Sequence, residues 1–323
     1  MANELRNPAF QDETKAREWL EGHLWPNGPV CPHCGVVNEA TEIGGEKHTH
    51  RAGLYMCNAC RKQFTVTVGT VFERSHVPLN KWLMATFLMC ASKKGMSAHQ
   101  LHRMLGVTYK TAWFMCHRIR EAMREGKFGP IGGEGKTVEA DETYVGGREK
   151  NKHGWKRKAD NIGGVGKEAV FALVERGGKV RSQHVADVTA RTLRPILEEQ
   201  LADANKTKFM TDGEGQYRIL AGMFASHEAV NHGIGEYVRG DAHTNTIEGY
   251  FSILKRGITG TYHHVSAEHL KRYLCEFDFR YNERSALDVT DQERAAKALK
   301  GIVGKRLTYR PARDEGREEE IPF

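Results

Sequence analysis

Three acidic residues that lie far apart in the sequence have the types and settings of a divalent-metal site. Asp141 ends the segment 137–141 and Asp212 ends the segment 208–212, and both segments are short runs typical of β-strands. Glu248 follows within a segment of helical spacing. Two carboxylates at strand ends and a third on a helix can hold a pair of Mg²⁺ (or Mn²⁺) ions per site. Such an ion pair can cut and join phosphodiester bonds.

The third acid has a competing interpretation. The segment Asn245-Thr-Ile-Glu248 fits a capping box, in which Asn245 is the N-cap and Glu248 reaches back to it without any metal. Glu248 and Lys255 also share one helical face, two turns apart. On that face the carboxylate would hold a metal ion and Lys255 would hold a phosphate as a point charge. Glu142 and Asp241 are weaker alternatives for a metal-binding acid.

Four cysteines upstream have the spacing of a zinc site. They form two Cys-x-x-Cys pairs, Cys31 with Cys34 and Cys57 with Cys60. Four thiolates close a tetrahedral ion completely, so the predicted zinc is structural. The gap between the pairs, residues 35–56, is slightly longer than the roughly 15–20 residues common in such sites. His33 or His50 could replace one cysteine, whereas a redox role for one pair is disfavoured by the presence of two.

The region around these cysteines resembles a zinc ribbon in its order of elements. After the second pair, residues 64–68 alternate apolar and polar types, as a half-buried strand should. Pair, strand, loop, pair and strand follow one another. We therefore predict a zinc ribbon with an N-terminal helix over residues 1–76. The sequence leaves open whether this ribbon contacts DNA or protein.

Residues 77–126 have the pattern of a helix-turn-helix segment. A first helix opens at Pro78, and a short helix over 97–105 has Ser97 as its N-cap. Gly106-Val107-Thr108 forms a turn, and a longer helix runs from Tyr109 through Met123. This arrangement predicts DNA contacts by Tyr109, Lys110, His117 and Arg118. The competing interpretation is an ordinary helical pair whose Trp113, Phe114 and Ile119 lie in a core.

The remaining chain predicts an α/β catalytic domain. Strands are expected at 137–145, 169–175, 179–185 and 207–212, with an amphipathic helix at 189–201 before the last of them. Acids on the first and fourth strands of this order are typical of an RNase H-like fold, with a mixed five-stranded sheet and flanking helices. We assign residues 127–300 to this domain. Residues 301–323 form a charged C-terminal tail, and we expect it to be frayed from Arg306 onward.

A basic insert interrupts the domain after its first strand. Residues 146–158 contain little core-forming material and predict a surface loop. Lys156 and Arg157 could contact phosphates, and Trp155 could stack on a base. A solvated loop without function is the alternative.

Composition favours a nucleic-acid partner. The chain has 323 residues with a net charge of +7, and a basic protein attracts polyanions. Its 39% hydrophobic content suffices for packed cores. The sequence contains neither an apolar run of the about 18–20 residues that a membrane span needs nor a hydrophobic signal core near Met1. Paired and single cysteines do not suggest a disulfide framework. We therefore expect a cytoplasmic protein with no membrane contact.

The motifs together resemble those of bacterial insertion-sequence transposases of the DDE superfamily that carry an N-terminal zinc ribbon, the ISXO2-like group. The resemblance runs from Cys31 to about Arg284. The matching stretches are the two cysteine pairs and residues 139–147, 211–213 and 245–264, and the last is the most specific.

The resemblance implies a transposase that binds the ends of an element and catalyses metal-dependent cleavage and strand transfer of double-stranded DNA. Two DNA ends imply a homodimer or higher oligomer, and DNA as the substrate implies association with the nucleoid. Lys255 and Arg256 would contact DNA. Some relatives use asparagine as the third catalytic residue, so Asn245 rivals Glu248.

Two other functions compete with transposition. One is a zinc-ribbon DNA-binding regulator built on an inactive nuclease fold. The other is an RNase H-like nuclease that cuts without strand transfer. The presence of all three candidate acids disfavours the first of these.

Overall fold

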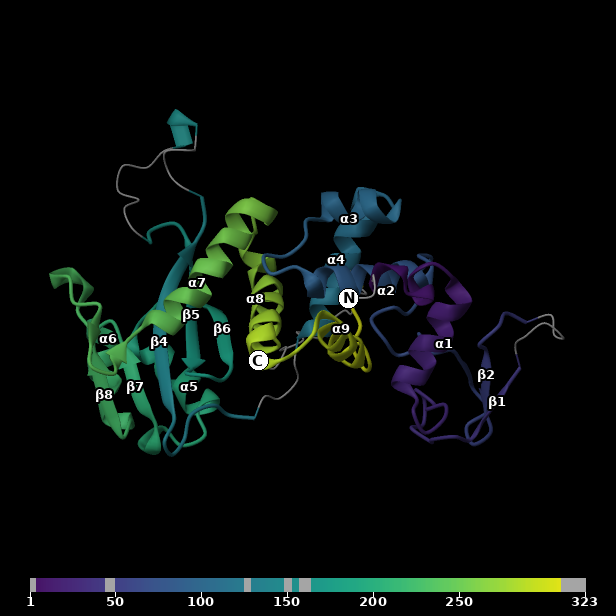
Figure 1. Cartoon of the computed structure of the whole chain (residues 1–323), viewed down its shortest axis with the longest axis horizontal. Helices are drawn as coiled ribbons and strands as arrows, with labels where there is room; N and C mark the ends of the chain where they lie inside the picture. Colours follow the sequence, from purple (N-terminus) through teal and green to yellow (C-terminus); the bar gives the residue numbers. More distant parts are fainter. Residues whose placement is uncertain (1–3, 44–49, 125–128, 148–152, 157–163, 309–323) are drawn as a thin grey trace, which may run out of the picture. The chain divides into compact units, whose positions relative to one another are not determined.

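The computed structural model describes residues 4–43, 50–124, 129–147, 153–156 and 164–308 (Figure 1). The chain divides into two compact units. The first combines residues 1–87 with 98–122 and 296–323, and the second combines 88–97 with 123–295. None of the helices in the described ranges is long and apolar enough to cross a membrane.

The first unit begins with a helix and a small sheet. Two 3₁₀ turns, Glu4–Arg6 and Pro8–Phe10, precede α1 (Glu13–Leu24). Asp12 caps α1 by accepting a hydrogen bond from the Lys15 N–H. The sheet is antiparallel, in the order β1 (Ala40–Glu42), β2 (Tyr55–Cys57) and β3 (Gln63–Phe64).

The strand predicted over 64–68 is shorter than expected. β3 ends at Phe64, and the Val68 N–H donates to the Thr65 carbonyl at 3.0 Å, which turns the chain back on itself. Phe64 and Val66 are nevertheless buried while Thr65 and Thr67 are partly exposed. The alternation of apolar and polar residues therefore corresponds to alternating burial. A turn produces this alternation here, as a strand would.

The helical segment has the predicted outline. It consists of α2 (Leu79–Ala91), α3 (Ala98–Leu105) and α4 (Tyr109–Met123), and α3 begins directly after Ser97. Gly106 ends α3 with a φ of 60°, a left-handed conformation that glycine adopts without a steric penalty. The turn between α3 and α4 thus follows from one glycine.

The first residues of the predicted C-terminal tail, before the expected fraying at Arg306, are held by hydrogen bonds. α9 (Asp291–Lys300) leads into residues 301–308. The Val71 N–H donates to the Ile302 carbonyl at 3.1 Å, and the Gly304 N–H donates to the Gly69 carbonyl at 2.8 Å. Ile302 is buried, so this apolar residue anchors the segment within the first unit. Residues 309–323 lie outside the described residues.

The second unit is built on a mixed five-stranded sheet, as predicted. Its order is β6-β5-β4-β7-β8, with β4 antiparallel to β5 and parallel to β7. The strands are β4 (Thr137–Val145), β5 (Glu168–Glu175), β6 (Val180–Val185), β7 (Lys208–Thr211) and β8 (Ser226–Ala229). A two-stranded hairpin of β9 (Val238–Arg239) and β10 (Ala242–His243) follows β8.

Helices cover both faces of this sheet (Figure 1). They are α5 (Ala190–Gln200), α6 (Gly215–Leu220), α7 (Asn245–Gly257) and α8 (Ala267–Asn282). A π-helical turn, Ile258–Tyr262, extends α7. Short 3₁₀ turns are Gly154–Lys156, Ala204–Lys206, Ala221–Met223, His232–Ile234 and Ser285–Leu287.

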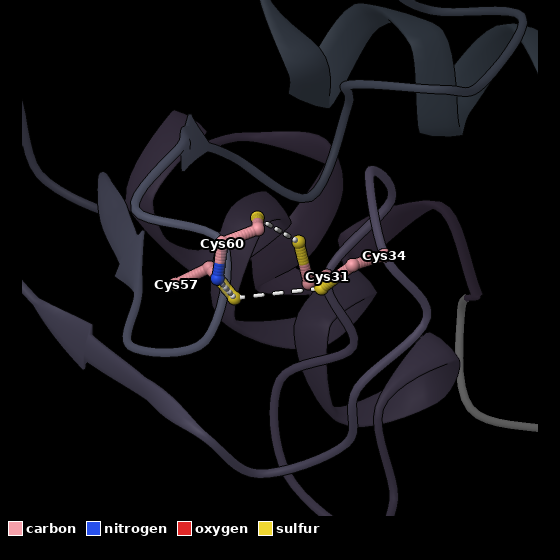
Figure 2. A group of neighbouring side chains, drawn as sticks. All are labelled: Cys31, Cys34, Cys57 and Cys60. Carbon is pink, nitrogen blue, oxygen red and sulfur yellow. Dashed lines mark hydrogen bonds between the residues drawn. The ribbon is translucent and has the colours of Figure 1, made fainter.

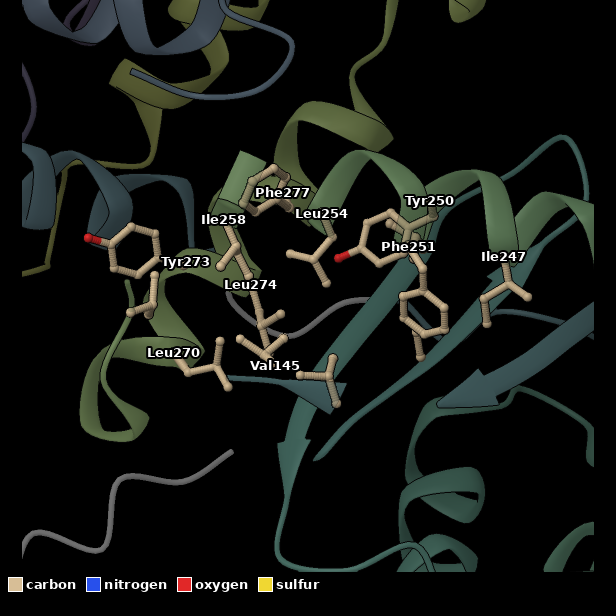
Figure 3. Close-up of a cluster of buried hydrophobic side chains, with 14 of the residues drawn as sticks. Val145, Ile247, Tyr250, Phe251, Leu254, Ile258, Leu270, Tyr273, Leu274 and Phe277 are labelled. Carbon is tan, nitrogen blue, oxygen red and sulfur yellow. The ribbon is translucent and has the colours of Figure 1, made fainter. Parts of the chain in front are cut away.

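The alternation of side chains along β4 and β5 separates two cores. Val138 and Ala140 pack with Leu193 of α5 and Tyr217 of α6 on one face. On the other face, α7 and α8 contribute the buried cluster in Figure 3, whose labelled members are Val145, Ile247, Tyr250, Phe251, Leu254, Ile258, Leu270, Tyr273, Leu274 and Phe277. Odd-numbered residues of β4 therefore face α7, because successive strand residues point to opposite faces.

Two polar side chains of α8 protect the edge strand β6. Asp278 accepts a hydrogen bond from the Ser182 N–H at 2.8 Å, and Asn282 accepts one from the Val180 N–H at 2.7 Å. Asp278 and Asn282, one turn apart on α8, thus bind the N–H groups of two β6 residues that are two positions apart. An edge strand whose N–H groups are already bonded is a poor template for pairing with another chain.

The close approach of α7 and α8 predicts an unequal effect of two glycine substitutions. A Cβ at Gly257 would collide with the Phe277 ring and lie 2.7 Å from the Lys94 carbonyl oxygen. Gly257→Ala should lower the free energy of unfolding by about 1–3 kcal/mol, as overpacking does. Gly249 lies in the same helix with nothing within 4 Å of a Cβ, so Gly249→Ala should raise it by roughly 0.5–1 kcal/mol.

Urea denaturation of both variants measures this difference. Equal effects of the two substitutions would contradict the tight packing of α7 on α8.

Candidate functional site

The four cysteines predicted to bind zinc lie together in the first unit (Figure 2). Their sulfur atoms all lie within 4.8 Å of one another, and the Cys31–Cys60 and Cys34–Cys57 Sγ–Sγ distances are both 3.7 Å. Tetrahedral coordination with Zn–S bonds of about 2.3 Å separates sulfurs by about 3.8 Å. The cluster therefore already has the dimensions of a four-thiolate zinc site.

The local contacts favour a thiolate at Cys57, whereas at Cys34 a hydrogen bond from the Val36 backbone, which lowers the pKa, is outweighed by burial and the neighbouring sulfurs, which raise it. The Cys60 N–H donates a hydrogen bond to the Cys57 Sγ at 3.4 Å. This bond is the largest of the effects that lower the pKa of Cys57 to about 7. His33 is exposed, with its Nε2 3.3 Å from the Gln63 carbonyl oxygen, and His50 is exposed. Among the described residues, neither histidine belongs to the metal-binding group, so the ligand set has four cysteines.

The acids Asp141 and Asp212 lie close together in the second unit. β4 and β7 run parallel with Glu139 opposite Met210. Asp141 lies two residues further along β4, and Asp212 directly follows Thr211, the last residue of β7. The negative charge of Asp212 contributes to the raised pKa of Asp141, as expected of neighbouring carboxylates. The strand register thus brings together two acids that are far apart in sequence.

Glu248 lies in the first turn of α7. Its Oε1 accepts a hydrogen bond from the Thr244 hydroxyl at 3.0 Å and lies 3.6 Å from the His232 Nε2. The N-cap of α7 is Thr244, not Asn245, so the predicted capping box with Asn245 as its cap is wrong. Glu248 is bonded to a side chain in the first turn, but its carboxylate remains exposed.

The three acids are less tightly grouped than the cysteines. In the part of the chain that the structure describes, only the four cysteines bring three or more ligand atoms within 4.8 Å of one another. In a two-ion site only a shared carboxylate contacts both ions, so the other two can stand on opposite sides of the pair.

The electrostatics of Asp141 show that it lies among other negative groups. Burial, together with the charges of Asp212, Glu142 and Glu248, raises its pKa to about 8, although the Glu142 N–H opposes this by donating to its carboxylate. The folded chain therefore retains a proton that the unfolded chain loses above its ordinary pKa of 3.8. Ionisation of Asp141 thus destabilises the fold as pH rises toward 8. A bound divalent cation would remove this cost.

Glu139, a residue that we did not predict to have a role, fixes α7 against β4. Its fully buried carboxylate accepts hydrogen bonds from the Thr246 N–H at 2.9 Å, the Ile247 N–H at 3.0 Å and the Thr246 hydroxyl at 2.8 Å. Arg176 forms an ion pair with it, with the Nε 2.7 Å from Oε1. Negative charge at a helix N-terminus is favourable, because the first N–H groups point outward.

Arg176 extends this contact to the chain leading into α7. Its Nη1 donates to the Asp241 carbonyl and its Nη2 to the His243 carbonyl, both at 2.9 Å. Glu139 and Arg176 therefore hold both the start of α7 and the strand before it. An acid inside an apolar strand, two residues before Asp141, was the available signal for Glu139, since a charge in such a place needs a buried partner.

The alternative acids lie elsewhere. Glu142 points to the opposite face of β4, where it accepts hydrogen bonds from the Tyr217 hydroxyl at 2.6 Å and from Gln216. Burial raises the pKa of Glu142. Asp241 lies in the turn between β9 and β10, and Asn245 is exposed at the first position of α7. Lys255 and Arg256 are exposed in the last turn of α7.

Two of the predicted DNA contacts are buried instead. His117 is only 1% exposed, and its ring centroid lies 4.2 Å from that of Trp113. Arg118 is 7% exposed and donates to the Glu73 and Leu307 carbonyls within the first unit. Neither side chain is available to DNA in this structure. These residues lie on the inward face of α4, which the periodicity alone did not identify.

The other predicted DNA contacts have different settings. Tyr109 is exposed and stacks on His99 with ring centroids 4.2 Å apart, and Lys110 beside it is exposed. Lys156 ends the 3₁₀ turn Gly154–Lys156, in which the Trp155 side chain is exposed. Arg157 lies outside the described residues.

A mixed five-stranded sheet with acids on its first and fourth strands and a third acid on a following helix defines an α/β domain of the RNase H-like type. Comparisons agree with this class. Residues 132–282 match the model of the ISXO2-like transposase domain, and residues 11–63 match that of the transposase zinc-ribbon domain. The chain is also 32% identical over 286 residues to an uncharacterized protein in transposable element ISH50 of Halobacterium salinarum, covering 84% of this chain and 91% of that protein.

The chain therefore belongs to the ISXO2-like transposase family, the one that its sequence motifs resemble.

The cysteine cluster predicts a measurable dependence on zinc. Cys57→Ser should lower the zinc content from one ion per chain toward zero and unfold the ribbon, because ligand binding and folding are coupled in such sites. Inductively coupled plasma mass spectrometry of the purified chain measures this content. Cys275→Ser, outside the cluster, is the matched control and should retain the ion. Full zinc content in Cys57→Ser would contradict the assignment.

The Glu139 contact predicts a large loss of stability. Glu139→Ala leaves Arg176 and two helix N–H groups without their acceptor and should cost about 3–5 kcal/mol, as broken buried ion pairs do. Glu139→Gln keeps an acceptor oxygen and should cost less. Urea denaturation measures both, with the exposed Glu198→Gln as a control that changes stability by less than about 0.5 kcal/mol. A loss no larger than that of the control would contradict the role of Glu139.

Proposed function

We propose that this chain is a DNA transposase that binds the ends of its element and catalyses metal-dependent strand cleavage followed by strand transfer. The observation that carries the proposal is that Asp141 on β4, Asp212 directly after the parallel strand β7 and Glu248 in the first turn of α7 lie close enough for the charges of the last two to raise the pKa of Asp141. The family of the chain supports the same reaction class.

The three acids fit a pair of Mg²⁺ or Mn²⁺ ions by the chemistry of their donors. Carboxylate oxygens are the ligands that these hard cations prefer. Asp141, Asp212 and Glu248 would hold these ions. When bound, such ions lower the pKa of an attacking water and stabilise a leaving oxygen. The raised pKa of Asp141 supports this fit, because a cation is what its surroundings lack.

The proposed reaction has two steps, and the second leaves the number of phosphodiester bonds unchanged. Water first attacks the phosphorus at the end of the element, one P–O bond breaks, and a 3′-hydroxyl is released. That hydroxyl then attacks a phosphodiester of the target, so one P–O bond forms as another breaks. No covalent bond between protein and DNA is required. Lys255, two turns after Glu248 on the exposed face of α7, would hold a phosphate in place during both steps.

DNA would also contact other cationic and aromatic side chains. Tyr109 and Lys110 are the exposed residues at the start of α4, the second helix of the helix-turn-helix. Arg256 adjoins Lys255 in the last turn of α7. Lys156 and Arg157 remain predicted contacts of the basic insert. His117 and Arg118 are excluded from this set by their burial.

The assembly and location follow from the proposed substrate. Two element ends must be joined to one target, which requires two active sites, so we propose a homodimer or higher oligomer on DNA. We also propose that the protein acts in the cytoplasm at the nucleoid, where double-stranded DNA is found.

The competing functions are disfavoured by particular residues. A regulator on an inactive nuclease fold has no need for acids, yet Asp141 is kept ionisable in a setting that costs stability. A nuclease without strand transfer would use the same three acids, so the geometry does not separate it from a transposase. The transposase-type zinc ribbon favours the transposase.

The proposal predicts that Asp141→Asn abolishes cleavage while DNA binding is retained, because binding depends on cations elsewhere. Cleavage of a labelled duplex that carries the element's end, with Mg²⁺ or Mn²⁺, measures the loss. Without divalent ions at pH 8, the same variant should melt on the order of 2–4 °C higher, since it removes a carboxylate that is costly to ionise. It should also lose the stabilisation that Mn²⁺ gives the unaltered chain.

Asp203→Asn, an exposed acid of the same unit, is the matched control and should cleave normally. Normal strand transfer by Asp141→Asn would overturn the assignment of the site. Cleavage without joined products in the unaltered chain would instead favour the nuclease.

A further inference from the structure

A cavity opens beside Asp212 that none of the assignments above uses. Its volume is about 510 Å³, within the range of roughly 300–1,000 Å³ of pockets that bind small organic ligands. Asp212 itself lines the cavity, together with Arg218 of α6 and residues of the segment 229–239. A group bound in this cavity would therefore lie next to the proposed reaction centre.

The segment 229–239, which lines part of the cavity, is held by hydrogen bonds within itself. Asn231 accepts a hydrogen bond from the Gly233 N–H at 2.9 Å, and the Glu236 carboxylate accepts one from the Asn231 N–H at 3.2 Å. Gly213 has a φ of 84°, and a Cβ added to it would lie 3.4 Å from the Val230 carbonyl oxygen. The loop after β7 and the segment after β8 thus lie close together without any ligand.

The two arginines of the cavity differ in their availability. Arg239 is engaged, because its Nη2 donates to the Ala229 carbonyl at 2.9 Å and its Nη1 lies 3.5 Å from Glu236. Arg218 is exposed and, within the described ranges, has no hydrogen bond or ion pair. Its guanidinium is therefore free to bind an anion from solution, and phosphate matches its fork of N–H donors.

The same cavity has an apolar side. Ile234 lines it and is 78% exposed, and Tyr237 and Val238 follow as exposed residues of the same segment. Large apolar side chains on one short exposed segment are a common feature of surfaces that bind a ligand. The carboxylates of Asp212, Glu214 and Glu236 also line the cavity, so Arg218 is the side chain there that is left to bind an anion. A phosphate on Arg218 with a sugar or a flat base on Ile234 matches a nucleotide.

This segment also connects the cavity to the third acid. The His232 ring stacks on Tyr237 with centroids 5.1 Å apart, and its Nε2 lies 3.6 Å from Glu248. The segment therefore runs from the wall of the cavity at Asp212 to the carboxylate of Glu248. The cavity at Asp212 and the carboxylate of Glu248 are therefore joined by one short segment of chain.

We propose that this cavity binds the nucleotide next to the reacting phosphodiester, with Arg218 on its phosphate and Ile234 against its sugar or base. The inference rests on the proposed function, because it supposes that DNA reacts at Asp141, Asp212 and Glu248. The cavity would hold the strand in register, so that the ions and the attacking oxygen meet one particular phosphorus atom.

The experiment measures coupling between Arg218 and single phosphates. Duplexes that carry the element's end receive a neutral methylphosphonate at one of the phosphates flanking the cleavage position. Binding is measured in Ca²⁺, so that affinity is determined without cleavage. Arg218→Ala should weaken binding of unmodified DNA roughly tenfold, as the loss of one charge-assisted hydrogen bond does. One methylphosphonate should weaken binding by the unaltered chain but have no further effect on Arg218→Ala.

The matched control is Arg194→Ala, an exposed arginine of α5 in the same unit. It should change affinity less than twofold and remain sensitive to the same methylphosphonate. Ile234→Ser should slow cleavage in Mg²⁺ and blur the cleavage position, which a merely structural residue would not do. Equal losses for Arg218→Ala and Arg194→Ala, or additive effects at every phosphate, would overturn the proposal.

Two further outcomes separate the alternatives. If Ile234→Ser changes the association of chains in analytical ultracentrifugation and no phosphate is coupled to Arg218, the segment contacts another copy of the chain and the proposal is wrong. If coupling to one phosphate is found but the unaltered chain does not cleave DNA in Mg²⁺ or Mn²⁺, the cavity binds DNA as proposed and the catalytic function fails instead.

Discussion

The buried carboxylate of Glu139 is the interaction on which the candidate site depends. It joins the central strand β4 to the first turn of α7, and Arg176 neutralises it while also holding the chain before that helix. A buried charge is expensive unless several donors surround it, so the contact tolerates little displacement. Glu248 directly follows Ile247, one of the donors of this contact, and Asp141 lies two residues along the strand from Glu139. The distance between two proposed metal ligands is therefore fixed by a third acid that binds no metal.

Adjacent residues of the central strand β4 face opposite sides of the sheet and have different roles. Its even-numbered residues fill the core under α5 and α6, and its odd-numbered residues present Glu139 and Asp141 to α7. Glu139 is satisfied by donors within the protein, whereas Asp141 is surrounded by Asp212, Glu142 and Glu248. One carboxylate thus stabilises the fold and the other opposes it. Strain of this kind at a proposed reaction centre is consistent with a site completed by cations from outside.

The sequence predicted those parts of the molecule that depend on local pattern. Asp141 and Asp212 were found because acids at the ends of apolar runs are unusual, and the cysteine pairs because their spacing is that of a zinc site. What depends on tertiary partners was not predictable. Periodicity placed His117 and Arg118 on α4 but did not show which face of that helix is buried. The N-cap of α7 was misplaced by one residue, since both Thr244 and Asn245 are acceptable caps. Ile302 gave no periodic signal, although it anchors the segment after α9.

The two proposed metal sites differ in ways that keep them from competing for the same ion. The thiolates of the ribbon are soft ligands that enclose an ion completely, so zinc there would add to stability but have no position for a substrate. The carboxylates of the second unit are hard and stand partly open, which suits Mg²⁺ or Mn²⁺ together with phosphate oxygens. The cysteines lie within 4.8 Å of one another as they stand, whereas the acids do not. The ribbon thus has the spacing of its ion as it stands, whereas the proposed acidic site would need cations to offset the mutual repulsion of Asp141, Asp212 and Glu248.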